Sequence, residues 1–340
     1  MEEIRRVIVN ENHEVVIEHT TAPKPGPRDA LVRMVYAGVC GSDTHAQRGR
    51  HPNITLPYAP GHEVVGVVED VGADVTNLVS GDRVTVEPTL PCWKCKPCHA
   101  GQQNLCENLD FFGCGHPQGG MADLFTIAAN RLHRVPDDID DLTATLIEPL
   151  ATPVHAARLA GSLRGKTVAV LGAGTIGLLI LSVVRAQGAA KVVVSDVLEG
   201  KRAAALARGA DAVVDATADD AVERVRQALG ESADVVFDCV ATQSTLTQAI
   251  GMALKGGTVV VVGVPSRDVT VPLPVIQDQQ VRIQGSATYL PEDFAASIEF
   301  LLAGAVRPQD IVTAQFPMDQ AAAAFDASSS GQHIKVLISA

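Results

Sequence analysis

The sequence predicts an α/β protein built from an all-β unit and a doubly wound parallel sheet. The chain has 340 residues, which favours two domains over one. Short β-branched runs separated by Gly, Pro and Asp fill residues 1–150, as in a small distorted barrel. From about residue 165, apolar strands alternate with helical stretches, which indicates a parallel sheet covered by helices. We therefore expect units at 1–150 and 151–289, with residues 290–340 returning to the first.

The expected strands follow in order along the chain. Those of the first unit are RRVIVN, EVVIEH, ALVRMVYAG, EVVGVVEDVG and DRVTVEP, with a cysteine-rich lobe at about 91–107. Those of the second unit are TVAVLG, KVVVSD, AVVDA, DVVFDCV, TVVVVG and VRIQGS, and six parallel strands fit the two-halved dinucleotide fold. In the tail, PEDFAASIEFLLAG predicts a helix and HIKVLISA a strand.

Composition excludes several classes of function. A net charge of −12 argues against a surface for polyanions, so we expect no nucleic-acid partner. The opening MEEIRRVIVN lacks the pattern of a signal peptide. The uncharged run between Lys166 and Arg185 is interrupted by glycines and predicts a strand, a turn and a helix rather than a membrane span. We expect a cytoplasmic protein without a membrane partner.

Four of the seven cysteines lie within sixteen residues, in the pattern C-x2-C-x2-C-x7-C. Cytoplasmic thiols stay reduced, so disulfides are disfavoured, and a thioredoxin-like redox pair needs only two cysteines. Thiolates on two-residue gaps favour a tetrahedral zinc ion, with an iron–sulfur cluster as the competing interpretation. Four cysteines leave no position for a substrate, so this zinc would be structural. The expected ligands are Cys92, Cys95, Cys98 and Cys106.

A glycine fingerprint, G-A-G-T-I-G, follows the first strand of the second unit and opens an apolar helix. Gly172 permits the tight turn, Gly174 lets a pyrophosphate approach, and Gly177 lets helix and strand pack closely. Asp196 ends the next strand and can accept from the ribose hydroxyls, which favours NAD over NADP. Lys201 and Arg202 lie nearby and leave NADP as the less favoured alternative. The candidate cofactor contacts are Gly172, Gly174, Thr175, Ile176, Gly177, Asp196 and Arg202.

A second polar group precedes the lobe. The segment C-G-S-D-T-H covers residues 40–45, and G-H-E covers residues 61–63. Cys40, His62 and a carboxylate are the residue types of an open catalytic zinc site, which keeps a fourth position for water or substrate. Adjacent side chains on a regular strand point to opposite faces, so His62 and Glu63 can share an ion only if the backbone after Gly61 is irregular.

With these motifs and the segment EPLATPVHA, the chain resembles the zinc-containing medium-chain dehydrogenase/reductase superfamily. The resemblance runs nearly from end to end, and within the superfamily it is to the sorbitol or polyol dehydrogenase-like branch. The resemblance implies a GroES-like β-barrel catalytic domain and a Rossmann domain that binds NAD. It implies two zinc ions in each chain, one catalytic and one structural. It also implies a homotetramer or homodimer that pairs through edge strands of the nucleotide domains.

Residue roles carried over from the family complete the candidate active site. Cys40 and His62 would be zinc ligands, Glu63 a direct or exchanging ligand, and Glu148 a carboxylate that reaches the metal directly or through water. Asp43 would orient His62. The expected proton relay is Ser42 and His45, and the expected reaction is transfer of a hydride from a secondary alcohol to NAD.

The substrate stays open at this point. Sorbitol-type relatives carry an Arg-Tyr pair where this chain has Thr288-Tyr289, so a polyol, diol, sugar, aminocyclitol or threonine substrate is considered. A threonine 3-dehydrogenase-like enzyme would need an anchor for the amino acid, and we assign none. Two rival classes are a non-enzymatic zinc-lobe binding protein and a zinc-free, NADPH-dependent enone reductase. The negative charge opposes the first rival, and Asp196 with the Cys40/His62 pair opposes the second.

Overall fold

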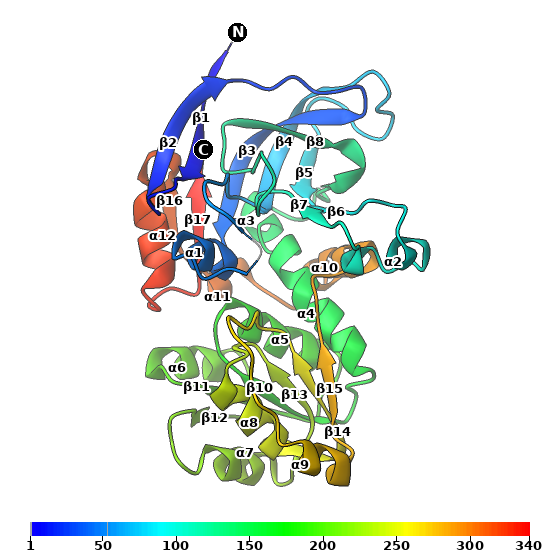
Figure 1. Ribbon diagram of the computed structural model, residues 1–340, viewed down its shortest axis with the longest axis vertical. Helices are drawn as coiled ribbons and strands as arrows, with labels where there is room; N and C mark the ends of the chain where they lie inside the picture. Colours follow the sequence, from blue (N-terminus) through cyan, green and yellow to red (C-terminus); the bar gives the residue numbers. More distant parts are fainter. Residues whose placement is uncertain (1, 53) are drawn as a thin grey trace. The chain divides into compact units, whose positions relative to one another are not determined.

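The computed structural model describes residues 2–52 and 54–340 and divides them into two compact units (Figure 1). The first unit runs to Pro149 and resumes from Arg307 to Ala340, and the second covers Leu150–Val306. The sequence had placed the return to the first unit at residue 290. Helix α10 (Pro291–Leu302) instead belongs to the second unit, where its buried Asp293 accepts from His155 of α4 (Ile147–Ala160) at 2.7 Å.

The first unit is organised around one long strand, β3. Its residues Asp29–Val39 pair with β4 along one edge, while β8 and β17 share the other edge. The sheet order is β16-β17-β3-β4-β5-β9. Apolar side chains of these strands form one buried core, which confirms the predicted β-rich domain. The strands are β3 (Asp29–Val39), β4 (Glu63–Val71), β5 (Arg83–Val86), β8 (Leu124–Ala128), β9 (Leu132–Arg134), β16 (Val312–Pro317) and β17 (Lys335–Ser339).

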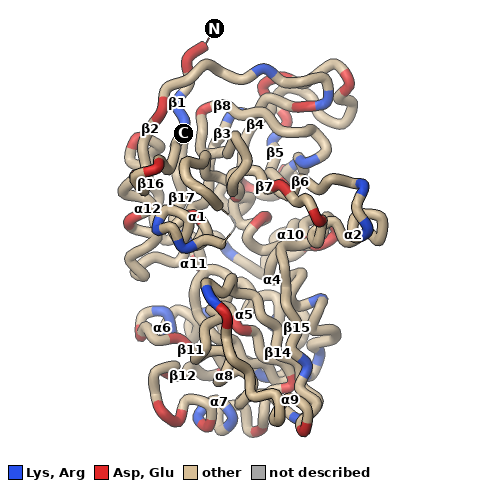
Figure 2. Tube along the Cα trace, viewed as in Figure 1, with Lys and Arg blue, Asp and Glu red and all other residues tan. Residues whose placement is uncertain are grey.

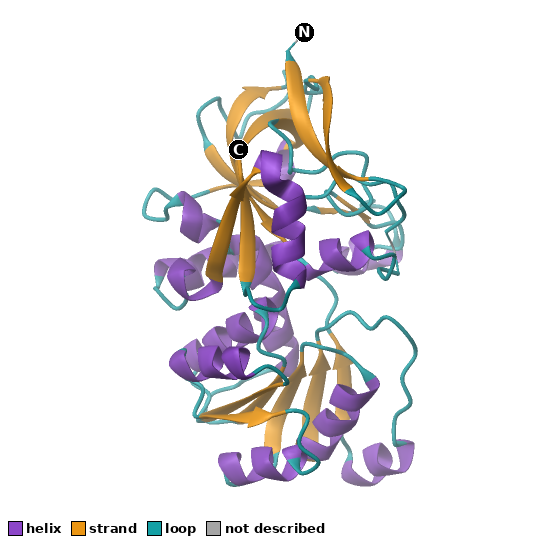
Figure 3. Ribbon diagram, turned by 90° about the vertical axis from the view of Figure 1, so that its left-hand side faces the viewer, coloured by secondary structure: helices purple, strands orange, loops and turns teal. Residues whose placement is uncertain are grey.

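Smaller elements surround this sheet. Two separate two-stranded sheets, β1–β2 and β6–β7, accompany it, and α12 lies against β16 and β17 (Figure 3). Short helices α1 and α2 begin directly after Cys40 and Cys95, so both cysteine motifs lie at helix starts. The elements are β1 (Glu3–Val9), β2 (Val15–Thr21), β6 (Thr89–Leu90), β7 (Asp110–Phe111), α1 (Gly41–Gln47), α2 (Lys96–His99), α3 (Asp141–Ala144), α11 (Pro308–Ile311) and α12 (Ala321–Ser329).

The second unit contains the six predicted parallel strands in the order β12-β11-β10-β13-β14-β15. The order reverses between β10 and β13, which is where doubly wound sheets bind dinucleotides. Every residue of β10 is buried, as its continuous apolar run predicts. The strands are β10 (Thr167–Leu171), β11 (Lys191–Asp196), β12 (Ala212–Asp215), β13 (Ala233–Asp238), β14 (Ala253–Val261) and β15 (Arg282–Gly285).

Helices cover both faces of this sheet (Figure 3). Besides α4 and α10, they are α5 (Thr175–Ala186), α6 (Glu199–Ala207), α7 (Ala221–Leu229), α8 (Gln243–Met252) and α9 (Leu273–Gln279). Among the described residues, none of these or the other helices has the length and apolarity to cross a bilayer. Lys and Arg are interspersed with Asp and Glu along the chain (Figure 2).

Candidate active site and metal centres

Three predicted metal ligands meet where β3 ends and β4 begins. Cys40 follows β3, His62 precedes β4, and Glu63 opens it, directly opposite Gly38 in the antiparallel register. One donor atom from each of the three side chains lies within 4.8 Å of the others. His62 and Glu63 are buried and Cys40 is half-buried. A thiol, an imidazole and a carboxylate form the mixed sulfur, nitrogen and oxygen set that suits zinc.

An irregular backbone allows His62 and Glu63 to serve one site. Gly61 has a left-handed φ of 108°, and a Cβ at this position would overlap the backbone of Met121. Only glycine fits both requirements. His62 therefore lies outside the regular strand, and its donor atom lies with those of Cys40 and Glu63 instead of on the opposite face.

Asp43 is fully buried beneath this group. Its carboxylate accepts a hydrogen bond from the Cys40 backbone N–H at 2.9 Å and one from the Tyr58 hydroxyl at 3.3 Å. Oδ1 lies 3.9 Å from Nδ1 of His62, which is too long for a hydrogen bond, and Nδ1 is buried without another partner. Burial raises the pKa of Asp43, although the neighbouring His62 opposes the change. Asp43 thus interacts with His62 through its charge alone, and its hydrogen bond with the Cys40 N–H stabilises the start of α1.

Ser42 and His45 lie three residues apart on α1 and so share one helix face. Ser42 Oγ is 3.5 Å from Nε2 of His62, at the edge of the donor group. His45 is exposed. Partial burial, followed by the charges of Arg48 and Arg50, lowers the pKa of His45. The structure therefore places Ser42 beside the donor group and His45 one turn away toward the surface.

Glu148 lies in the first turn of α4 and is buried, but it is not among the three residues whose donor atoms converge. Its charge nevertheless acts on the site. Burial raises the pKa of the Cys114 thiol to about 12, and the charges of Asp43, Cys40 and Glu148 add to this increase. Phe111 packs edge-on against His62, with ring centroids 5.7 Å apart.

The sequence analysis missed Lys335, the first residue of β17. This lysine is 3% exposed, and its Nζ donates to Oε1 and Oε2 of Glu63 at 2.7 and 2.6 Å. Burial alone would lower the pKa of Lys335, but the charges of Glu63 and Cys40 raise it. A single lysine in the apolar run I-K-V-L-I was the available signal, because a charged side chain there needs a buried partner.

The four lobe cysteines converge on a second centre. Their sulfur atoms all lie within 4.8 Å of one another, and the distance from Cys95 Sγ to Cys106 Sγ is 3.9 Å. This is far longer than a disulfide, and it matches the edge of about 3.8 Å expected for a tetrahedron with Zn–S bonds of about 2.3 Å. Backbone N–H groups of Cys92 and Asn108 donate to Cys106 Sγ at 3.2 and 3.4 Å. The group fits a structural zinc.

The glycine fingerprint forms the turn between β10 and α5. Gly172 has a φ of 93°, and a Cβ on Gly177 would overlap the Gly172 carbonyl. No atom lies within 4 Å of the Cβ position of Gly174, so the space in front of the helix start is open. Thr175 and Ile176 form the first turn of α5. Together these features leave room for a phosphate at a helix N-terminus.

Asp196 closes this turn from β11. Its Oδ2 accepts from the Ala173 backbone N–H at 2.7 Å, and its Oδ1 accepts from the Leu198 N–H at 2.9 Å. Arg202 does not extend freely toward the site. It donates to the carbonyl oxygens of Asp196 and Val197 at 2.8 and 2.9 Å, and it lies 3.3 Å from the Asp215 carboxylate.

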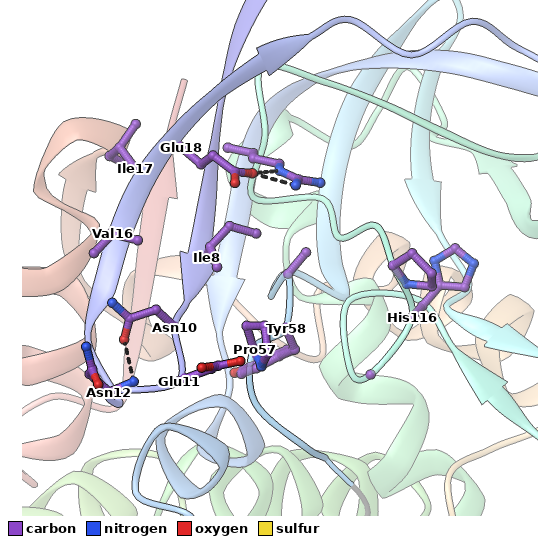
Figure 4. A pocket seen from close by; sticks show the side chains of 14 residues that line it. Ile8, Asn10, Glu11, Asn12, Val16, Ile17, Glu18, Pro57, Tyr58 and His116 are labelled. Atoms are coloured by element: carbon purple, nitrogen blue, oxygen red, sulfur yellow. Dashed lines mark hydrogen bonds and ion pairs between the residues drawn. The ribbon is translucent and has the colours of Figure 1, made fainter.

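A groove of about 800 Å³ lies elsewhere on the first unit, between the β1–β2 hairpin and the segments 57–59 and 115–117 (Figure 4). None of the converging donors lines it. Tyr58 is its one described link to the site, through the hydrogen bond to Asp43. We assign the groove no function.

A β unit with an open Cys/His/Glu centre, followed by a doubly wound sheet with a glycine fingerprint, defines a metal-dependent nucleotide-linked dehydrogenase. Sequence comparison agrees with this class. Residues 26–137 match the family described as alcohol dehydrogenase GroES-like domain, and residues 175–303 match the family described as zinc-binding dehydrogenase.

Three similar proteins illustrate the relationship. Sorbitol dehydrogenase of Arabidopsis thaliana is 34% identical over 93% of this chain and 89% of its own. The structure of a zinc-binding dehydrogenase of Sinorhizobium meliloti 1021 bound to NADP matches with a TM-score of 0.93, at 31% identity over the whole of both chains. An alcohol dehydrogenase of Escherichia coli CFT073 complexed with NADH matches with a TM-score of 0.93, at 26% identity over the whole of both chains. The chain belongs to the zinc-containing medium-chain dehydrogenase/reductase superfamily, and its relatives include polyol dehydrogenases.

Proposed function

We propose that this protein oxidises a secondary alcohol, of the polyol, sugar-alcohol or diol class, and transfers the hydride to NAD. The observation that carries the proposal is the convergence of Cys40, His62 and Glu63 in a chain whose second unit has a complete dinucleotide fingerprint. Neither feature alone names an oxidoreductase. Together they supply the two partners of alcohol oxidation, an electrophilic metal and a hydride acceptor.

In this proposal Cys40 and His62 hold the catalytic zinc, with Glu63 and Glu148 as carboxylates that bind it directly or exchange with water. Cys92, Cys95, Cys98 and Cys106 hold the structural zinc. When bound, the catalytic ion supplies a Lewis acid that lowers the pKa of the substrate hydroxyl. Asp43 keeps the His62 imidazole in place from behind.

Ser42 and His45 move the proton. Ser42 lies beside His62 and would accept the proton from the substrate hydroxyl. The lowered pKa of His45 keeps its imidazole neutral near pH 7, so it can accept the proton and release it to solvent from its exposed position on α1. The family resemblance implies that these two residues act as one relay.

NAD is the proposed cofactor, and NADP the less favoured one. The Asp196 carboxylate would repel a 2′-phosphate, and Arg202, which could attract one, is held by two carbonyls and by Asp215. Two structural relatives contain NADP and NADH respectively, so the preference is a property to be measured for this chain.

The substrate class rests on the relatives, which include sorbitol dehydrogenase. Sorbitol itself is disfavoured because Thr288 stands where sorbitol-type enzymes carry an arginine. An aminocyclitol, a sugar or threonine are the alternatives. We further propose a cytoplasmic homodimer or homotetramer, for which the edge strand β15 is the candidate contact.

The test is the formation of NADH from NAD and a panel of secondary alcohols. The panel holds sorbitol, xylitol, inositols, 2,3-butanediol and threonine, each with and without a zinc chelator, next to elemental analysis of the purified protein. Chelator-sensitive turnover with about two zinc ions per chain supports the proposal. One zinc ion per chain, as the four-cysteine lobe alone would bind, without NAD turnover would favour the enone reductase, which lacks a catalytic zinc. Salt-sensitive retention on DNA resin without turnover would favour the binding protein.

A further inference from the structure

Lys335 sits in an unusually complete set of contacts. Its ammonium has three N–H donors and three acceptors in reach, which are both Glu63 oxygens and the Val39 carbonyl oxygen at 3.3 Å. The residue is 3% exposed and Glu63 is 2% exposed, so water does not compete for either group. The lysine comes from β17 and the carboxylate from β4, and both lie next to β3 in the sheet.

The absence of a side chain at Gly38 leaves room for the Glu63 carboxylate in this position. It lies over Gly38, where a Cβ would overlap Oε2 and come within 3.1 Å of Glu63 Cβ. Gly38 pairs with Glu63 on one side and with Leu337 of β17 on the other. The strand that carries the lysine and the strand that carries the glutamate therefore both pair with β3 at Gly38.

A purely structural role explains these contacts poorly. Two buried charges are costly to desolvate, and a well-packed apolar pair usually replaces them without loss of stability. Here the pair lies at the donor group, because Glu63 is also one of the three residues whose donor atoms converge within 4.8 Å. The Glu63 carboxylate thus faces two cations, the Lys335 ammonium and the ion that the three donors would bind.

We propose that Lys335 is a positioning residue for the catalytic metal: it holds Glu63 by both oxygens, weakens this carboxylate as a ligand, and offsets part of the negative charge around the ion. The proposal rests on the proposed function, in which Cys40, His62 and Glu63 hold the ion. The charge of Glu148 also acts on Lys335, so the ammonium offsets part of the negative charge that Cys40, Glu63 and Glu148 place around the ion. A Glu63 carboxylate that is held and partly neutralised in this way can exchange with Glu148 at the ion.

The experiment compares Lys335→Met and Lys335→Arg with the unmodified protein, without substrate. Zinc affinity is measured by competition with a chelator, and the ligand set is measured from the visible spectrum of the protein loaded with cobalt. Removing a neighbouring positive charge and freeing Glu63 should tighten metal binding by about tenfold or more in Lys335→Met and change the cobalt bands. Lys335→Arg should retain the affinity and the bands of the unmodified protein.

Gly38→Ala provides the opposite perturbation and serves if Lys335→Met does not fold. The added methyl group pushes the end of the flexible Glu63 side chain away while Lys335 keeps its charge, so metal binding should weaken. Cys40→Ser provides the spectral background of the four-cysteine lobe.

Two failures are distinguishable. Unchanged or weaker zinc binding in Lys335→Met, with unchanged cobalt bands, overturns the role of Lys335 and leaves the proposed function standing. If no cobalt band depends on Cys40, the site does not hold a metal, and the proposed function and this inference fail together.

Discussion

The backbone N–H of Ala173 donates a 2.7 Å hydrogen bond to Oδ2 of Asp196, which ties the glycine turn after β10 to the end of β11. The other carboxylate oxygen accepts from Leu198. Asp196 therefore shapes the turn that would bind a pyrophosphate and also lies where the family places the ribose hydroxyls. Substituting it would disturb both, so the preference for NAD is better tested through its neighbour Arg202.

Asp215→Asn should raise kcat/KM for NADP by about two- to fivefold while the value for NAD changes little. The substitution removes the carboxylate that holds Arg202 together with two backbone carbonyls, and a partly exposed ion pair of this kind contributes about 0.2–1 kcal/mol. The measurement is steady-state kinetics with both cofactors. Asp220→Asn, which removes the partner of Arg224 on α7, is the control for net charge. An equal increase of kcat/KM for NADP in the control would show that the ion pair between Arg202 and Asp215 is not the cause.

Cys98→Ser and Cys40→Ser should have opposite effects. Losing a ligand of the lobe should lower Tm by about 5 °C or more and leave the turnover of the folded fraction nearly intact, because structural zinc contributes to folding. Losing Cys40 should abolish turnover with a small change in Tm. Thermal unfolding and active-fraction kinetics on both variants provide the check. Equal loss of turnover at matched folding would contradict the separate roles.

Asp234→Asn should flatten the acid limb of the stability curve. Burial raises the pKa of Asp234, but hydrogen bonds from Lys166 and Thr167 outweigh this and lower it. A carboxylate with a lowered folded-state pKa stabilises the fold above its unfolded value of about 3.9, and this contribution is lost as the pH falls through the folded value. The Tm difference between the two proteins should thus be largest above about pH 5 and should decrease as the pH falls below about 4. Exposed Asp326→Asn is the control, and a difference independent of pH would refute the assignment.

Ile283→Lys should shift the proposed homo-oligomer toward smaller species. Ile283 is 37% exposed on β15, an edge strand of the six-stranded sheet, and unpaired edges with apolar side chains favour pairing with another chain. Light scattering after size-exclusion chromatography measures the change. Leu206→Lys, on α6 beside the other end of the sheet, is a control at an apolar residue that is 52% exposed. An unchanged mass would place the contact elsewhere.

Thr288→Arg should raise the activity toward sorbitol relative to 2,3-butanediol. It introduces the arginine of sorbitol-type relatives, and a side chain unbranched at Cβ tolerates the left-handed φ of 47° at this position better than threonine does. The Thr288 hydroxyl is buried without a hydrogen-bond partner, so its loss removes no described bond. The ratio of kcat/KM values for the two alcohols is the measurement. Thr288→Val is the matched control, and an unchanged ratio in Thr288→Arg would locate specificity in other residues.

Features that depend on neighbours in sequence were predictable. The six parallel strands follow from continuous apolar runs, and the glycine turn follows from a six-residue motif. The four lobe cysteines lie within sixteen residues, so their spacing already indicates one tetrahedral ion. The boundary near residue 290 was less accessible, because α10 joins the second unit through a buried contact between His155 and Asp293, 138 residues apart.

By itself, the sequence determined the class of fold, the nucleotide turn, the two cysteine motifs and the residue types of the open metal centre. Only the tertiary structure decided how these residues share their charges. Whether Glu63 meets an ammonium depends on Lys335, 272 residues away, and on the register that sets β17 and β4 on either side of β3. A contact of this kind leaves no local pattern, because it comes from strand pairing across the whole domain.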